Sequence, residues 1–288
     1  MSTENSSRAR FGEMGLSPAV CTALQTVGYE TPTPIQALTI PHMAAGKDVL
    51  GQARTGTGKT AAFALPLLSG INLDNRQPQV LVLTPTRELA IQVARSFKTY
   101  GKYMKGLSVL AVYGGQSYGA QLTPLKRGVH VVVGTPGRLM DHLRRKTVSF
   151  SNLTALVLDE ADEMLHMGFI DDVEWILSRT PDNAQKALFS ATMPGPIRKI
   201  AGTHLTRPEE IIVRHEADVM STISQTYWMI KGAGKSAALV RILQAAEFDG
   251  VIVFTKTRHA TVQVARALEE KGFRAEALNG DMAQAARE

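Results

Sequence analysis

In this chain of 288 residues, short apolar runs alternate with amphipathic stretches. This alternation limits the possible folds more than any other feature of the sequence. Between the runs, apolar residues recur at helical spacing, as Leu89, Val93 and Phe97 do in a predicted helix over residues 87–100. Strands separated by helices favour an α/β fold, in which helices cover both faces of a parallel sheet. The runs have the length and composition of buried strands, and they lie at residues 48–52, 80–84, 109–112, 130–134, 155–159, 187–190 and 211–213.

Ligands of such sheets bind beyond the carboxyl ends of the strands. Small or polar residues follow several of the predicted strands directly, so we expect one edge of the sheet to hold the candidate site. These segments are residues 53–60, Thr84–Pro85, Gly134–Thr135, Asp159 and Ser190.

The segment at residues 53–60, Ala-Arg-Thr-Gly-Thr-Gly-Lys-Thr, has the character of a phosphate-binding loop. Its glycines let backbone N–H groups turn toward phosphates, and the helix expected to start at Gly58 adds a positive end. Lys59 supplies a charge for the terminal phosphates, and Thr60 offers a hydroxyl to Mg²⁺. A turn that binds nothing is the alternative, since the generic motif begins with Gly where this chain has Ala53. The predicted nucleotide-binding residues of the loop are Ala53, Thr55, Gly56, Thr57, Gly58, Lys59 and Thr60.

A second chemical signal is the tetrad Asp-Glu-Ala-Asp at residues 159–162, which follows the apolar run 155–158. A buried strand there would deliver Asp159 to the sheet edge as a Mg²⁺ ligand, with Glu160 beside it to orient or deprotonate water. The alternative for the tetrad alone is a solvated acidic strand end. Occurring together and in this order, the loop and the tetrad predict a magnesium–ATP site, with Lys59, Asp159 and Glu160 as its catalytic residues.

Composition excludes some classes of protein and supports others weakly. The chain is 44% hydrophobic and 20% charged, an ordinary globular balance, and its net charge of +6 is compatible with an anionic partner. One cysteine, Cys21, cannot form an internal disulfide and is typical of a reducing compartment, so we expect a cytoplasmic protein. No apolar run has membrane-spanning length, and we expect no membrane partner. Residues 1–10 are polar and predict a flexible tail.

After residue 213 the alternation pauses, which predicts a first domain over residues 11–213, a linker at 214–224 and a second unit at 225–288. Strands are expected in the second unit at residues 225–230, 250–255 and 275–278, too few to complete a sheet and core. Residues 232–236, Gly-Ala-Gly-Lys-Ser, are interpreted as a turn before a helix at 237–246 and not as a second phosphate loop.

With these segments in place, residues 11–287 resemble the DEAD-box ATP-dependent RNA helicases of helicase superfamily 2. The tetrad Asp-Glu-Ala-Asp is the sequence after which the family is named. A phosphate loop that begins with Ala also resembles that of the family. Residues 28–36, Gly-Tyr-Glu-Thr-Pro-Thr-Pro-Ile-Gln, are similar to its Q motif. The resemblance implies that Gln36 pairs with the adenine edge, which would select ATP over GTP, and that Phe11 stacks on the base.

Further segments resemble the RNA-contacting motifs of the family. They combine small or hydroxyl residues, whose backbone N–H groups can meet a phosphate, with a nearby arginine. Taken singly, Pro85 and Pro136 would indicate only the first residues of helices. The RNA-binding residues implied by the resemblance are Pro85, Thr86, Arg87, Gly114, Gly115, Thr135, Pro136, Gly137, Arg138 and, in a Gln-x-x-Arg element at residues 284–287, Arg287.

Ser190-Ala191-Thr192 is similar to the family motif that couples hydrolysis to strand separation. The hydroxyl groups of Ser190 and Thr192 could bond toward Asp162, so that a nucleotide-dependent shift reaches the RNA. In the second unit, residues 251–257 resemble motif IV.

The resemblance implies two RecA-like lobes that close on ATP and RNA and unwind short duplexes locally or remodel RNA–protein complexes. Family members continue through two further motifs, one of which ends in arginines that reach the γ-phosphate. Residues 1–288 hold neither motif, so we expect a chain truncated within the second lobe that binds nucleotide but turns it over weakly. Two alternatives stay open: an ATP-gated RNA clamp or adaptor that does not unwind, and a P-loop ATPase that acts on DNA or protein.

Overall fold

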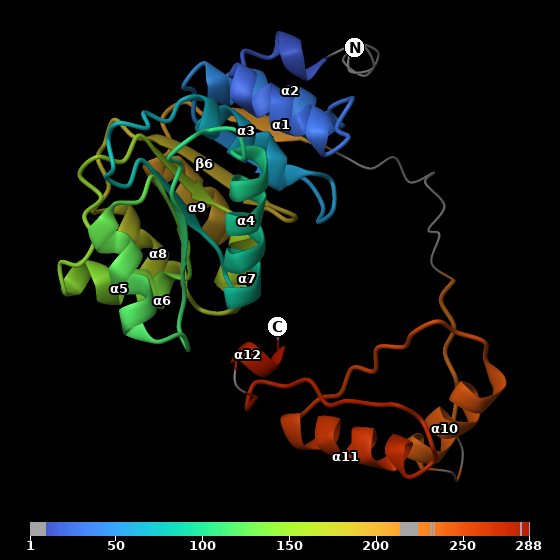
Figure 1. Cartoon of the computed structure of the whole chain (residues 1–288). Helices are drawn as coiled ribbons and strands as arrows, with labels where there is room; N and C mark the ends of the chain where they lie inside the picture. The colour runs from blue at the N-terminus through green and yellow to red at the C-terminus, as the bar shows by residue number, and fades with distance from the viewer. Residues whose placement is uncertain (1–9, 214–223, 231, 233, 283, 288) are drawn as a thin grey trace. The chain divides into compact units, whose positions relative to one another are not determined.

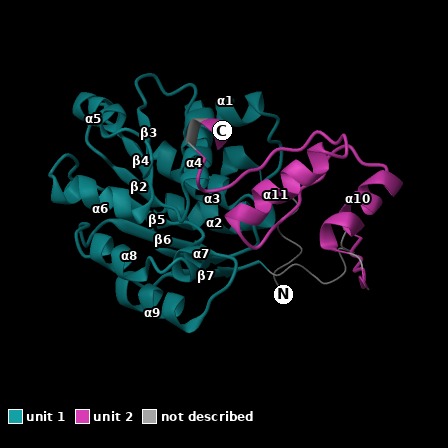
Figure 2. Cartoon of the chain, turned by 90° about the horizontal axis from the view of Figure 1, so that it is seen from below, with its two compact units in different colours: residues 1–215 teal, residues 216–288 magenta. Residues whose placement is uncertain are grey.

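The computed structural model describes residues 10–213, 224–230, 232, 234–282 and 284–287. The chain divides into two compact units, Met1–His215 and Glu216–Glu288, which Figure 2 colours separately. Apart from Arg10 and Ser224, the predicted tail and the predicted linker lie outside the described residues.

The first unit is built on a seven-stranded sheet in the order β3-β4-β2-β5-β6-β1-β7, and every neighbouring pair is parallel. This confirms the predicted α/β fold. Each predicted strand is present, although β6 begins two residues before the predicted start and β7 is displaced toward the N-terminus. The strands are β1 (Val49–Gln52), β2 (Val80–Leu83), β3 (Val109–Val112), β4 (Val131–Gly134), β5 (Ala155–Leu158), β6 (Gln185–Ser190) and β7 (Glu209–Ile212).

Helices cover both faces of the sheet. Successive strand residues point to opposite sides, so that apolar side chains on each face need a covering layer. Val80 and Val82 belong to one apolar cluster with α1–α4, whereas Leu81 and Leu83 belong to a second cluster with α6–α9. Figure 1 shows these helices around the sheet. Their bounds are η1 (Phe11–Glu13), α1 (Pro18–Thr26), α2 (Pro34–Ala44), α3 (Lys59–Ser69), α4 (Arg87–Tyr100), α5 (Tyr118–Arg127), α6 (Pro136–Arg144), α7 (Ala161–His166), α8 (Ile170–Leu177) and α9 (Gly195–His204).

Helix α4 illustrates how local sequence sets the ends of an element. Its predicted span, residues 87–100, is confirmed. The side chain of Thr86 accepts a hydrogen bond from the backbone N–H of Leu89 at 3.2 Å, and so satisfies one of the free donors of the first turn. Val93 and Phe97 are fully buried on the face that packs against the sheet.

The described part of the second unit contains helices α10 (Lys235–Ala245), α11 (Arg258–Glu269) and α12 (Gln284–Arg287), and no strand. The helix predicted at 237–246 is confirmed as α10. The strands predicted at 225–230, 250–255 and 275–278 are wrong. Apolar residues do recur there, but no backbone hydrogen bond joins these segments to another described residue, and side chains such as Phe254 are 91% exposed. An extended segment becomes a strand only when a partner strand satisfies its backbone and covers its apolar face.

The two tryptophans of the chain lie in different units. The ring of Trp175 on α8 has the guanidinium of Arg179 at 3.6 Å and that of Arg144 at 5.3 Å from its centroid. Trp228 is 65% exposed. Among the described residues, no helix is both long enough and apolar enough to cross a membrane.

Candidate functional site

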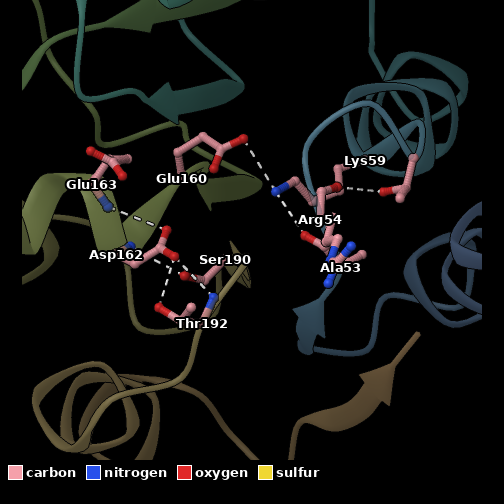
Figure 3. Close-up of polar contacts among 9 residues, drawn as sticks. Ala53, Arg54, Lys59, Glu160, Asp162, Glu163, Ser190 and Thr192 are labelled. Carbon is pink, nitrogen blue, oxygen red and sulfur yellow. Dashed lines mark hydrogen bonds and ion pairs between the residues drawn. The ribbon is translucent and has the colours of Figure 1, made fainter. Parts of the chain in front are cut away.

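The strand order brings the phosphate loop and the acidic tetrad together at the carboxyl edge of the sheet. Strands β5, β6 and β1 are neighbours, and they end at the tetrad, at Ser190 and at the loop respectively. The backbone N–H of Ala53 donates to the carbonyl of Ser190 at 3.1 Å, so loop and strand end are joined directly. Segments far apart in the sequence therefore share one site (Figure 3).

Two glycines give the phosphate loop its shape. Gly56 and Gly58 have φ angles of 79° and 93°, in the region that residues with a side chain rarely adopt. At Gly58 a side chain would also displace Gln36, because a Cβ atom would lie 2.3 Å from its Nε2. Gly58 is the residue before the first turn of α3, so this turn presents the helix N-terminus to the loop.

Lys59 connects the loop to the tetrad. The side chain is only 5% exposed, and its Nζ donates to the carbonyl oxygen of Ala53 at 3.0 Å and lies 3.2 Å from Oε1 of Glu160. Figure 3 shows Glu160 reaching toward Lys59 across the site. Glu160 itself has a φ of 54°, which is uncommon for a residue other than glycine. Strain of this kind clusters at functional sites.

Asp159 is an almost fully buried carboxyl group of the site. The residue is 2% exposed, and its Oδ1 has no hydrogen-bond partner among the described residues. Burial and, to a lesser extent, the neighbouring Glu160 raise the pKa of Asp159 to about 7, against the opposing effect of Lys59. Two adjacent carboxyl groups with one cation leave the site short of positive charge, and an orphaned carboxylate oxygen is a suitable ligand for a hard divalent cation. The residues present therefore fit Mg²⁺.

Asp162 bonds to both hydroxyl residues predicted to couple with it. The backbone N–H and the hydroxyl of Thr192 each donate to Oδ2 of Asp162 at 2.9 Å, and the backbone N–H of Asp162 donates to the Ser190 hydroxyl at 3.2 Å. Burial acts to raise the pKa of Asp162, but the hydrogen bonds from Ser190 and Thr192 outweigh it, so the pKa lies below its ordinary value. Asp162 is thus held as a carboxylate.

Gln36 and Phe11 lie near the loop but are engaged with the protein. The Gln36 amide accepts from the backbone N–H of Thr33 at 3.0 Å and donates to the carbonyl of Gly58 at 3.2 Å. The Thr33 hydroxyl donates to the carbonyl of Thr57 at 2.8 Å. The ring of Phe11 is 5% exposed and packs in the apolar core. Adenine contact by Gln36 and Phe11 stays a prediction. The support that Thr33 gives to the loop was not predicted, although Thr-x-x-Gln at a helix start signals a capping box.

Two of the three arginines predicted to contact RNA, Arg87 and Arg138, converge on the loop at residues 113–116, which we call the arginine loop. A Cβ atom on Gly115, whose φ is 88°, would lie 2.3 Å from Nη1 of Arg87, so the guanidinium of Arg87 packs against the glycine pair. Arg138 on α6 donates from Nη1 to the carbonyl of Gln116 at 3.2 Å. Pro136 is buried at the start of α6, and Gly137 beside it is exposed. Arg287 belongs to the second unit and is not among the residues that the first unit assembles.

The other predicted positions also lie at this edge. Pro85 and Thr86 follow β2 and precede α4, and Thr135 follows β4, where its backbone N–H donates to the carbonyl of Val112 at 3.1 Å. Thr55 and Thr60 lie in the phosphate loop and in the first turn of α3. Sequence reasoning missed Gln121 and His142, two buried residues behind the arginine loop, because neither belongs to a local motif.

Comparison with known proteins agrees with this geometry. The family model of the DEAD/DEAH box helicases matches residues 33–200. "ATP-dependent RNA helicase DeaD" of Escherichia coli (strain K12) is 52% identical over 278 residues, which cover 96% of this chain and 44% of that protein. The protein of the same name from Mycobacterium tuberculosis is 54% identical over 282 residues, covering 98% and 50%. The chain thus spans about half the length of the curated relatives it matches.

A solved structure is similar over nearly the whole chain. The crystal structure of a DEAD box protein from the hyperthermophile Methanococcus jannaschii shares 40% sequence identity, with a TM-score of 0.68. The match covers 96% of this chain and 75% of that one.

Proposed function

The chain belongs to the DEAD/DEAH box helicase family, and from this membership we propose that its first unit binds magnesium–ATP and hydrolyses it in response to RNA. The observation that carries the proposal is the ion pair between Nζ of Lys59 and Oε1 of Glu160, which are 3.2 Å apart. Beside this pair lies Asp159, whose Oδ1 has no hydrogen-bond partner among the described residues. These are a cation for phosphates, a carboxylate for water and a ligand for Mg²⁺, and they lie in the segments that follow strands β1 and β5.

In this proposal the loop amides and the N-terminus of α3 hold the phosphates, and Lys59 neutralises their charge. Thr60 and Asp159 would hold Mg²⁺, which neutralises the charge that develops during phosphoryl transfer. When the nucleotide binds, its phosphates would draw Lys59 away from Glu160. The Glu160 carboxylate would then be free. That carboxylate then orients the attacking water and accepts its proton.

We further propose that RNA binds along the same edge, beside the arginine loop. Arg87, Arg138 and the backbone at Gly114 and Gly115 would contact its phosphates, with little selectivity for base. A nucleotide-dependent shift would pass from Asp162 to Ser190 and Thr192, which are bonded to it. Motif IV and Arg287 would add contacts from the second unit. The activity proposed for the whole protein is local unwinding of short RNA duplexes or remodelling of RNA–protein complexes.

The test is steady-state ATP hydrolysis by the 288-residue chain, with and without single-stranded RNA. For Lys59→Ala we expect nucleotide affinity to fall at least about tenfold, because a hydrogen bond to a charged group contributes about 1.5–3 kcal/mol. For Glu160→Gln we expect nucleotide affinity to be kept and turnover to fall about 10²- to 10⁴-fold, the contribution of a general base. Lys47→Ala is the matched control, since Lys47 pairs with Glu209.

Retained affinity in Lys59→Ala would contradict the phosphate-loop assignment. Stimulation by DNA equal to that by RNA would indicate a different polymer substrate. ATP-dependent RNA retention without unwinding would favour the clamp. We expect the chain to bind ATP but to hydrolyse it slowly.

A further inference from the structure

Gln121 on α5 is a fully buried amide that uses its whole hydrogen-bonding capacity. Its Nε2 donates to the carbonyl of Tyr113 and to Oε1 of Gln116, both at 2.9 Å. Its Oε1 accepts from Nη1 of Arg138 at 3.1 Å and lies 2.9 Å from Nε2 of His142. Two donors and two lone pairs are all that a glutamine amide offers, so each of the four partners is fixed by the same group.

Three of these partners belong to the arginine loop and to Arg138, which also contacts the loop directly. Tyr113 and Gln116 flank the pair Gly114-Gly115, whose open backbone accommodates Arg87. Arg138 donates to the Gln116 carbonyl as well as to Gln121. Removing the Gln121 amide would therefore release both ends of the loop and one anchor of the guanidinium at once.

His142 fixes the orientation of the amide from behind. Because Oε1 of Gln121 can only accept, Nε2 of His142 carries a proton. Burial lowers the pKa of His142, and Arg138 and Arg145 lower it further against the opposing effect of Asp141, so the ring is neutral near pH 7. Its Nδ1 then accepts from the Thr147 hydroxyl at 2.8 Å. The ring of Tyr118 stacks on the imidazole, with centroids 4.5 Å apart and planes at 10°.

We propose that Gln121 is a positioning residue for RNA: it holds the loop 113–116 and the guanidinium of Arg138 in the one arrangement in which both meet the phosphate backbone. This inference rests on the proposed function, because it assumes that the loop and Arg138 contact RNA. Gln121 itself is buried and touches no RNA. Its effect passes through the groups it bonds to, as hydrogen bonds behind a site orient the side chains within it.

The competing view is that Gln121 is only a satisfied polar group in the core. Gln79, directly before β2, is the matched control. It is 3% exposed, its Nε2 donates to the carbonyls of Asn72 and Asn75 at 2.7 Å, and its Oε1 accepts from the backbone N–H of Asn72. Gln79 is thus nearly as buried as Gln121 and its side chain makes three hydrogen bonds against four, but it lies at the amino end of its strand, away from the arginine loop.

The experiment measures binding of a fluorescein-labelled oligouridine by anisotropy, in the presence of a non-hydrolysable ATP analogue, together with binding of the analogue and thermal unfolding. For Gln121→Leu we expect RNA affinity to fall at least about tenfold, as for loss of hydrogen bonds to a charged group, with affinity for the analogue unchanged. For Gln79→Leu we expect a comparable loss of thermal stability, with RNA affinity unchanged.

A double-mutant cycle with Arg138→Ala separates positioning from general damage to the core. If Gln121 acts through Arg138, the double variant loses less RNA affinity than the sum of the single losses. Gln121→Glu provides a variant of nearly the same volume, in case Gln121→Leu does not fold. It still accepts from Arg138 but faces the Tyr113 carbonyl with an oxygen, and we expect it to weaken RNA binding too.

Wild-type RNA affinity in both Gln121 variants would overturn the inference while leaving the proposed function intact. Equal RNA losses in Gln121→Leu and Gln79→Leu, or losses that add fully in the cycle, would also overturn it. A wild-type chain that binds the analogue but no RNA would overturn the proposed function and this inference together.

Discussion

At the scale of single residues, the most informative group is Asp159, because its surroundings oppose its charge. Burial and the adjacent Glu160 together raise its pKa to about 7. An ionised carboxyl group in this position destabilises the folded protein at neutral pH. Binding of a cation or a proton removes this destabilisation. The site is therefore arranged for ligand binding at the expense of stability.

A pH dependence of folding follows from this pKa. Between the ordinary Asp value of about 4 and the raised value, the folded protein binds a proton that the unfolded chain does not. The contribution of Asp159 to stability should thus fall as pH rises through this range and level off above about 7. The measurement is urea unfolding at a series of pH values without ATP or Mg²⁺, in the wild type and in Asp159→Asn.

We expect Asp159→Asn to flatten this slope, because the amide does not titrate. The pKa of Asp162 is shifted in the opposite direction, so its hydrogen bonds are lost only at a pH below the range measured. Equal slopes in the wild type and Asp159→Asn would show that Asp159 does not titrate as described.

A second prediction at this scale compares the two glycines of the phosphate loop. Both have positive φ angles, but a Cβ atom would meet Gln36 at Gly58 and nothing within 4 Å at Gly56. Alanine in the left-handed region costs roughly 1–2 kcal/mol at either position. Only Gly58→Ala should also displace Gln36 and reduce ATP affinity strongly. Isothermal titration with ATP would test this, and equal effects of the two substitutions would contradict it.

At the scale of elements, the sequence was sufficient for the strands of the first unit and for the helix at residues 87–100, but not for the order of the strands in the sheet. Apolar runs such as 131–134 are fully buried, and their Val-rich composition marks them as strands. Nothing local states that β1 lies between β6 and β7 or that β5 adjoins β6. That order brings the phosphate loop to the tetrad.

The same distinction explains what was predicted of the site. The phosphate loop and the tetrad are local motifs, and their residues converge as expected. Gln121 and His142 had no such signal, because their partners come from α5, α6 and the loop after β3. The strands predicted in the second unit failed for the converse reason. Their local pattern is that of strands, but the described residues provide no partner backbone.

At the scale of the molecule, the site residues of the phosphate loop, the tetrad and the arginine loop all belong to the first unit. Its sheet is covered on both faces by apolar clusters of its own residues. A unit with a complete core of this kind can fold alone.

We therefore predict that residues 1–215, expressed alone, fold cooperatively and bind ATP with an affinity within about threefold of the 288-residue chain, since the groups proposed to bind ATP all belong to this unit. RNA affinity should be lower, because Arg287 and motif IV are removed. Circular dichroism during thermal unfolding and titration with ATP would test this. A fragment that is unfolded, or that binds no ATP, would contradict it.

The placement of the two tryptophans gives the protein a pair of built-in optical reporters. Trp175 in the first unit is covered by arginine side chains, whereas Trp228 in the second unit is largely open to solvent. A neutral quencher such as acrylamide will reach the indole of Trp228 far more readily than that of Trp175. Replacing either ring by phenylalanine leaves an emission signal that belongs to one unit alone, so the response of each unit to ATP or RNA can be followed without any attached dye.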